Sequence, residues 1–315
     1  MQKSLYAFAL VVLVFMTFVF FSSYTNEPDS KEYVSANGEK AAPTKSKDGT
    51  GIAQVVEPVP IPGDANLAGE YIPLDNPDAR ERLDRELMVN TYWQSATLQH
   101  IKLANRYFPT FERIFAEEGV PDDFKYLAVI ESSLRNAVSP AGARGLWQFM
   151  SATAKGYGLI VNTEVDERYH LEKSTRAAAK YLKKLHGEFG SWTMAAAAYN
   201  MGETRLRGLV RKQGSNNYFD LEMNAESARY VSRVVAVKTI MKNPTGYGFY
   251  LNDGDLYSPH NNCKTVEVNT AVPNWATWAK QQNISYRSLK YHNPWLRDTK
   301  LTNTAKRTYN VKVPY

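Results

Sequence analysis

The amino-acid sequence predicts a mainly α-helical domain followed by a small α+β module. Apolar residues recur with the spacing of amphipathic helices from about Asn76 to about Lys242, without a convincing alternating strand run. After Leu256 the pattern changes to short strands and helices in the order βααβ. The 315 residues suffice for one sizeable domain, this module and accessory segments. Cys263 is the single cysteine, so the fold must depend on packing and not on a disulfide.

The first 24 residues have the composition of a membrane-targeting segment. Residues 5–21 are almost wholly apolar and uncharged, and Lys3 precedes them. This run is longer than the usual core of a signal peptide and approaches the length of a membrane span. A retained anchor is therefore favoured over a cleaved signal peptide, and both remain open. The positive end before the run, together with the acidic residues after it, predicts that the rest of the chain lies in the cell envelope, on the periplasmic side of the membrane.

Residues 25–85 are expected to form a flexible linker and a lead-in to the helical domain. Residues 25–68 are poor in large apolar side chains and contain five Pro and four Gly. Such a composition does not supply the apolar surface that a core needs. The predicted helical domain then occupies residues 86–255, and the α+β module occupies residues 256–315.

A helix is predicted to begin at Pro121, because proline and the acids Asp122 and Asp123 suit a first helical turn. The spacing i, i+3, i+4 and i+7 predicts that one face packs inward. That face carries Phe124, Leu127, Ala128 and Glu131.

Glu131 is the carboxylate within this apolar face. Moving a carboxylate from water into an apolar surround raises its pKa from about 4.3 toward neutrality. A general acid at pH 7 requires such a pKa. The alternative is a helix-edge residue that pairs with Arg135, four positions further on.

Two further helices are marked by their caps. Ser174 is expected to cap a helix that ends at Gly190, and Ser191 is expected to cap the next one. Tyr199 and Asn200 lie at the end of that second helix, where side chains are well placed for ligand contact.

Residues 139–153 are predicted to form a tight loop before a packed segment. Pro140, Gly142 and Gly145 precede an aromatic stretch that begins at Trp147. Such a loop brings backbone atoms close to a ligand.

Together, these motifs resemble the signature of lytic transglycosylases of the goose-type lysozyme superfamily. The resemblance covers about residues 86–255 and contains four motifs in order. They are the pair Glu131 and Ser132, the stretch from Ser139 to Met150, the triplet Ala198, Tyr199 and Asn200, and the set Glu226, Ser227, Tyr230 and Val231. Ser227 replaces the threonine of the family pattern.

The resemblance implies a lysozyme-like (SLT) catalytic fold that cleaves the β-1,4 bond between N-acetylmuramic acid and N-acetylglucosamine in peptidoglycan. The family works with one glutamate, which implies that Glu131 is the catalytic acid and base and that no cofactor is needed. The products of the family carry 1,6-anhydromuramic acid ends. The residues implied to line the cleft are Ser132, Ser139, Gln148, Met150, Tyr199, Asn200 and Tyr230. A hydrolytic goose-type lysozyme and a non-catalytic wall-binding protein remain the alternatives.

Other chemistries find little support in the sequence. The five histidines form no HExxH or HxH motif, so a metal site is not expected. The glycines at 142 and 145 lie between helices, unlike the glycines of a phosphate-binding loop. Residues 256–315 carry a net charge of +7, but the membrane-targeting segment makes nucleic acid an improbable partner.

The βααβ order of the module resembles that of LysM glycan-binding modules, as does the Asn-Pro-Trp-Leu stretch that ends at Leu296. The usual Gly-Asp-Thr-Leu motif is absent, and residues 271–275 take its place. We therefore expect a divergent LysM-like fold with weak affinity for glycan. Some of its aromatic side chains are expected to form the core of the module, and others to remain free for sugars.

Overall fold

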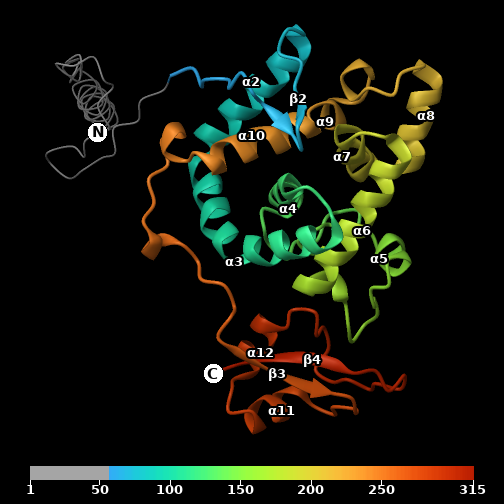
Figure 1. The fold of residues 1–315 in the computed structure, drawn as a ribbon. Helices are drawn as coiled ribbons and strands as arrows, with labels where there is room; N and C mark the ends of the chain where they lie inside the picture. Colours follow the sequence, from blue (N-terminus) through green and yellow to red (C-terminus); the bar gives the residue numbers. More distant parts are fainter. Residues whose placement is uncertain (1–56) are drawn as a thin grey trace, which may run out of the picture. The chain divides into compact units, whose positions relative to one another are not determined.

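The computed structural model describes residues 57–315 and shows a mainly helical domain followed by a small βααβ module (Figure 1). This confirms the predicted fold class. The predicted targeting segment and the first part of the linker lie outside the described residues. Within residues 57–315, no helix is both long and apolar enough to cross a membrane.

The helical domain contains nine α-helices within the described part of the chain. They are α2 (Pro77–Tyr92), α3 (Gln94–Glu118), α4 (Lys125–Ser132), α5 (Ser151–Gly156), α6 (Leu171–Phe189), α7 (Trp192–Met201), α8 (Glu203–Gln213), α9 (Ala225–Ala228) and α10 (Tyr230–Lys242). A two-stranded antiparallel hairpin, β1 (Asn66–Leu67) and β2 (Glu70–Tyr71), precedes them.

Helix α4 lies in the middle of this domain, where α3 and α10 contact it (Figure 1). Its predicted inward face is correct, because Phe124, Leu127 and Ala128 are fully buried. A 3-10 turn, Asp122–Phe124, leads into the helix. The helix ends at Ser132, because Ser133 and Leu134 adopt left-handed backbone conformations. The short length of α4 places Glu131 in its last turn.

Asp123 has a role that its sequence position does not reveal. Its side chain makes no helix-capping hydrogen bond. Instead, Oδ2 accepts a 2.5 Å hydrogen bond from Lys238 Nζ and a 2.8 Å hydrogen bond from the Ala68 amide. Asp123 and Lys238 are both buried, so the pair connects the start of α4 with α10 and the hairpin.

The predicted caps of α6 and α7 are partly correct. Gly190 ends α6 in the left-handed conformation with φ of 78°, and Ser191 Oγ accepts a hydrogen bond from the Met194 amide at the start of α7. The prediction for Ser174 is wrong. Helix α6 begins at Leu171, and its cap lies four residues earlier than predicted, where the ring of His170 accepts from the Lys173 amide. Histidine is not a typical capping residue, so the sequence pattern favoured the serine.

The packed domain begins well before residue 86, the expected boundary, which falls inside α2. Val59, Leu67, Ile72 and Leu83 are buried in the main core. The carboxylate of Glu70 accepts hydrogen bonds from the backbone amides at the start of α7. The lead-in, expected to be flexible, is therefore packed from about Val59 onward. A few apolar side chains among the prolines are enough to bury this segment against the core.

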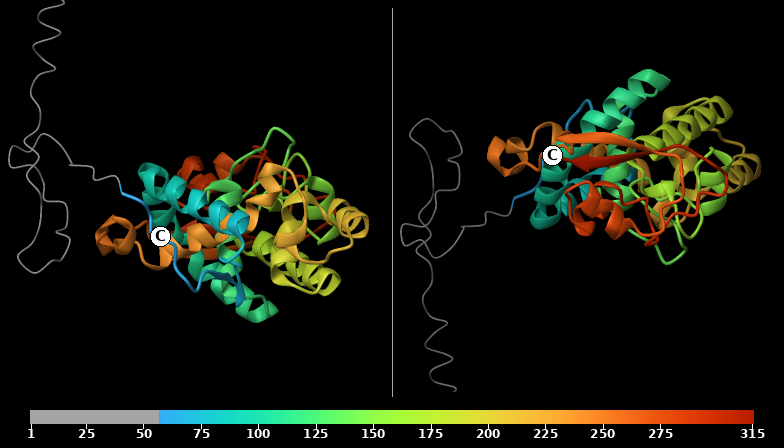
Figure 2. Two further views of the ribbon diagram at one scale, coloured as in Figure 1. Left: turned by 90° about the horizontal axis from the view of Figure 1, so that it is seen from above. Right: turned by 90° about the horizontal axis from the view of Figure 1, so that it is seen from below.

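The module consists of β3 (Cys263–Val268), α11 (Trp275–Gln281), α12 (Tyr286–His292) and β4 (Tyr309–Pro314). Strands β3 and β4 pair antiparallel from Cys263↔Pro314 to Val268↔Tyr309, and Figure 2 shows them side by side. The predicted βααβ order is confirmed.

The core of the module is shared with the helical domain. Trp275 and Trp295 are buried in it, as predicted for part of the aromatic set, whereas Tyr291 is 54% exposed. Val165 and Tyr169, from the segment before α6, belong to the same core cluster. The module thus packs against the helical domain through apolar side chains.

Candidate active site

Glu131 is partly buried and accepts a hydrogen bond from Tyr230. The distance from Tyr230 Oη to Glu131 Oε1 is 2.5 Å. Burial raises the pKa of Glu131, and the negative charge of Glu226 adds to this effect. The Tyr230 hydrogen bond and the positive charge of Arg233 act in the opposite direction, but the pKa remains raised. The raised pKa favours the protonated carboxyl group, which is the form that donates a proton in general acid catalysis.

The alternative partner, Arg135, is not paired with Glu131. Within residues 57–315, no ion pair joins the two side chains. The reason is the end of α4 at Ser132, since the left-handed Ser133 turns the chain before Arg135. The backbone amide of Arg135 instead donates to the carbonyl of Ser132.

A buried tyrosine, Tyr230, and a partly buried one, Tyr199, accompany the carboxylate. Tyr230 is the first residue of α10 and is 1% exposed. Burial raises its pKa well above 10, and the charge of Glu131 acts in the same direction. The same two causes raise the pKa of Tyr199, whose hydroxyl donates to the carbonyl of Trp147 at 2.7 Å. Both phenols therefore stay protonated and remain hydrogen-bond donors.

The loop of residues 139–149 is closed by its own hydrogen bonds. The amide of Ser139 donates to the carbonyl of Ala143, whose own amide donates to Ser139 Oγ at 3.0 Å. Gln148 has a positive φ of 46°, and its Nε2 donates to the carbonyls of Gly145 and Ala137 at 2.8 and 3.2 Å. Gln148 thus helps to hold the loop in its folded path.

Ser132, Met150 and Asn200 occupy three different environments. Ser132 is buried, and its hydroxyl lies 2.9 Å from the carbonyls of Ala128 and Leu146, so it joins α4 to the loop. Met150 is 46% exposed at the start of α5. Asn200 Oδ1 accepts a 2.9 Å hydrogen bond from Ser227 Oγ, which brings two of the downstream motifs together.

Six of the eight predicted residues thus form two connected groups, whereas Met150 and Asn200 belong to neither. The first group consists of the carboxyl group of Glu131 with Tyr199 and Tyr230 beside it. The second group consists of Ser132, Ser139 and Gln148, which shape the neighbouring loop. Tyr199 links the groups through its bond to the Trp147 carbonyl.

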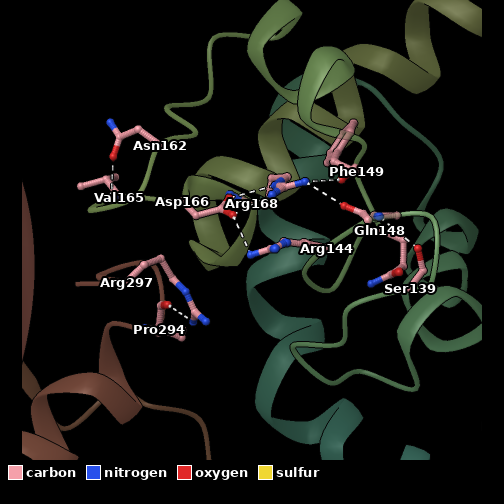
Figure 3. Close-up of polar contacts among 12 residues, drawn as sticks. Ser139, Arg144, Gln148, Phe149, Asn162, Val165, Asp166, Arg168, Pro294 and Arg297 are labelled. Atoms are coloured by element: carbon pink, nitrogen blue, oxygen red, sulfur yellow. Dashed lines mark hydrogen bonds and ion pairs between the residues drawn. The ribbon is translucent and has the colours of Figure 1, made fainter. Parts of the chain in front are cut away.

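Sequence reasoning missed a buried ion pair behind this loop, shown in Figure 3. Asp166 and Arg168 are 2% and 4% exposed, and the Arg168 guanidinium donates to both carboxylate oxygens of Asp166. The pair lies at a short 3-10 helix, Glu167–Tyr169, which is too short for any periodicity to distinguish a buried Asp-x-Arg from a solvated one. Within residues 57–315, no group of His, Cys, Asp or Glu side chains is arranged to hold a metal ion.

Comparison with known families matches both parts of the chain. Residues 111–221 match the transglycosylase SLT domain, and residues 264–315 match the soluble lytic transglycosylase C-terminal LysM-like domain.

Several lytic transglycosylases are similar to this chain. It is 30% identical over 214 residues to membrane-bound lytic murein transglycosylase D of Escherichia coli, covering 66% of this chain and 46% of that protein. It is 31% identical over 144 residues to membrane-bound lytic murein transglycosylase F of Alcanivorax borkumensis, covering 40% of this chain and 29% of that one. The chain therefore spans less than half the length of these relatives.

A solved structure with some likeness is the 70 kDa soluble lytic transglycosylase of Escherichia coli. It has 18% sequence identity and a TM-score of 0.39, and the match covers 61% of this chain and 33% of that one. The helical domain of this chain carries a match to the transglycosylase SLT domain at residues 111–221, and the module matches the soluble lytic transglycosylase C-terminal LysM-like domain at residues 264–315.

Proposed function

We propose that this chain is a peptidoglycan lytic transglycosylase. It cleaves the β-1,4 bond between N-acetylmuramic acid and N-acetylglucosamine and leaves 1,6-anhydromuramic acid ends, which makes it a carbon-oxygen lyase. The observation that carries this proposal is the single carboxyl group of Glu131, with a raised pKa and a hydrogen bond from the buried Tyr230. The SLT family match supports the same reaction.

Glu131 serves first as acid and then as base. Its carboxyl group gives a proton to the glycosidic oxygen while the bond from that oxygen to C1 of the muramic acid breaks and positive charge develops on the ring. The resulting carboxylate then takes the proton of the 6-hydroxyl as O6 attacks C1. No water is consumed, and Glu131 ends the cycle protonated.

A second catalytic carboxylate is unnecessary in this mechanism. Glycosidases that use two hold them about 5 to 9.5 Å apart. Glu226 is near enough to raise the pKa of Glu131, but it is exposed. Asp123 is bound to Lys238 at the opposite end of α4. The internal 6-hydroxyl has a large proximity advantage over a diffusing water molecule, which favours the anhydro product.

The remaining residues bind the glycan and hold the acid in place. We assign substrate contacts to Ser139, Gln148, Met150, Tyr199 and Asn200. Tyr230 orients the carboxyl group through its hydrogen bond. Ser132, buried between α4 and the loop, supports the same geometry.

The partner is the glycan strand of the cell wall, so the enzyme acts in the cell envelope, on the periplasmic side. The apolar run at residues 5–21 would anchor it to the membrane, and the proline-rich linker would let it reach the wall. The relatives named above are described as membrane-bound, in keeping with this location.

Product analysis on purified sacculi tests the proposal. Mass spectrometry should detect muropeptides with anhydro ends, each one water lighter than the product of a hydrolytic lysozyme. Glu131→Gln protein, prepared in parallel, is the blank that detects contaminating hydrolases. Reducing ends without the anhydro ring would favour the lysozyme alternative, and wall binding without release would favour a non-catalytic protein.

A further inference from the structure

The segment of residues 164–168 contacts both the C-terminal module and the loop that carries Gln148. We propose that Asp166 and Arg168 are positioning residues that couple docking of the module to the geometry of this loop. The module is then a structural part of the catalytic unit in addition to any affinity for the wall. The kinetic half of this inference rests on the proposed function, whereas its structural half does not.

On the side of the module, the segment pairs with residues 295–297. Val165 forms a bridge with Leu296, and the amide of Asp166 donates to the Trp295 carbonyl at 2.9 Å. The amide of Arg297 donates to the carbonyl of Glu164 at 2.8 Å. The Val165 side chain is 1% exposed within the module core, so the segment docks through both backbone and apolar contacts.

Further polar contacts reinforce this docking. The guanidinium of Arg297 lies 4.4 Å from the centre of the Tyr169 ring, a cation-π contact. Glu164 Oε2 accepts hydrogen bonds from the amide and the hydroxyl of Thr302. Lys312 on β4 forms an ion pair with Glu172 in the first turn of α6.

On the side that faces the loop, residues 164–168 contribute the ion pair of Asp166 and Arg168. Asp166 has an extended backbone, in which successive side chains point in opposite directions, so Val165 enters the module core while Asp166 faces Arg168. Arg168 holds the carboxylate with Nε at 2.9 Å and Nη2 at 2.8 Å. Its Nη1 donates to the carbonyls of Gly142 and Phe149 at 3.2 and 3.1 Å. Figure 3 shows Arg168 between Asp166 and Phe149.

These contacts fix the two arms of the loop relative to each other. The backbones of Arg144 and Phe149 exchange hydrogen bonds of 3.1 and 3.2 Å, which close the turn that contains Gln148. The positive φ of Gln148 is uncommon for a residue with a side chain and persists only where the surroundings enforce it. Gly145 packs directly against the backbone of Arg168, with no room for a side chain. The loop therefore packs directly against residues 164–168.

The buried charges explain why the two sides should respond together. The planar guanidinium of arginine can donate two hydrogen bonds to a carboxylate and still donate to two carbonyls. A lysine ammonium cannot do this in the same geometry. If the module shifts, Trp295 releases the Asp166 amide, and the buried pair loses its alignment. A misaligned buried pair is costly, so the loop must rearrange with it.

The test uses the full chain and the variants Leu296→Ala, Arg168→Lys and their combination. Hydrogen exchange of the Arg144 and Phe149 amides reports the closure of the loop, and kcat and KM on soluble glycan report catalysis. We expect each single variant to exchange these two amides about tenfold faster and to lower kcat by about tenfold, with KM changed less than about twofold. The double variant should lose little more than either single variant, because both act on one network.

Val311→Ala, on β4, is the control for a weakened module core, and it should leave the two amides protected. If Leu296→Ala does not fold, Arg297→Ala at the exposed cation-π contact replaces it. Unchanged amide exchange in the docking variants would overturn the inference, as would strictly additive losses of kcat in the double variant. If the parent protein releases no anhydro-muropeptides, the proposed function fails, while the exchange measurement still decides the coupling.

Discussion

The hydroxyl of Tyr230 lies 2.5 Å from Oε1 of Glu131, although the two residues are 99 positions apart in the chain. The tyrosine begins α10 and the glutamate lies in the last turn of α4, so the packing of these two helices sets the contact. The hydrogen bond favours the ionised carboxylate, whereas burial favours the neutral acid. These two opposing effects on its pKa suit a group that acts first as acid and then as base.

Glu131→Gln should abolish turnover while the fold and substrate binding persist. Glutamine is nearly isosteric, but it neither delivers nor accepts the proton, so activity should fall by at least roughly 10²- to 10⁴-fold. The assay is release of anhydro-muropeptides from sacculi. Glu226→Gln, which changes an exposed neighbouring acid, should retain most of the activity. Near-normal release by Glu131→Gln would end the single-carboxylate mechanism.

The same substitution should stabilise the protein at neutral pH. Burial raises the pKa of Glu131 above its unfolded value, so its contribution to stability is complete below the unfolded pKa and is lost as pH rises through the folded pKa. Glutamine has no such penalty. Urea unfolding of both proteins at several pH values should show the advantage of Glu131→Gln growing with pH, and an advantage that is greatest in acid would contradict the sign.

Tyr230→Phe should move the basic limb of the pH profile to higher pH. The lost hydrogen bond is one of the contacts that lower the pKa of Glu131, so its removal leaves burial less opposed. Because Glu131 must be protonated for the first step, kcat/KM should then persist to higher pH. The measurement is kcat/KM across pH. Tyr218→Phe is a matched control, since its buried hydroxyl donates to the Ser227 carbonyl and not to Glu131.

Asp123→Asn should destabilise the fold far more than Asp122→Asn. Asp123 is buried against Lys238, and removal of one partner of a buried ion pair costs about 3–5 kcal/mol. The side chain of Asp122 is 54% exposed in its pair with Lys125, so its loss should cost about 1 kcal/mol or less. Free energies of unfolding from urea titrations decide the matter. Equal costs would show that both acids act only on the first helical turn.

Gly145→Ala should impair the enzyme more than Gly142→Ala does. Both glycines have positive φ values, 82° and 85°, so an alanine at either position meets similar backbone strain. At Gly145, however, the new Cβ would also overlap the carbonyl of Arg168, whereas at Gly142 it meets open space. Unfolding free energies and turnover of both variants provide the comparison, and equal losses would mean that the close packing on Arg168 is unimportant.

Local patterns in the sequence were sufficient for most of the fold. Apolar spacing placed the inward face of α4 and the acid at its end, and cap residues such as Ser191 and Gly190 marked the helix ends. The order βααβ followed from short alternating and helical patterns after Leu256. These features depend on residues a few positions apart, so they leave a periodic trace in the chain.

Contacts between distant segments were decided by the tertiary structure alone. The pairing of Asp123 with Lys238 spans 115 positions, and the pairing of Thr302 with Glu164 spans 138. The packing of Leu67 in the core likewise depends on helices far along the chain. The sequence determined which side chains could carry the chemistry, because local spacing selects the buried face of each helix. Only the fold decided which groups surround Glu131 and support its loop, because burial and charge pairing depend on distances that no local pattern encodes.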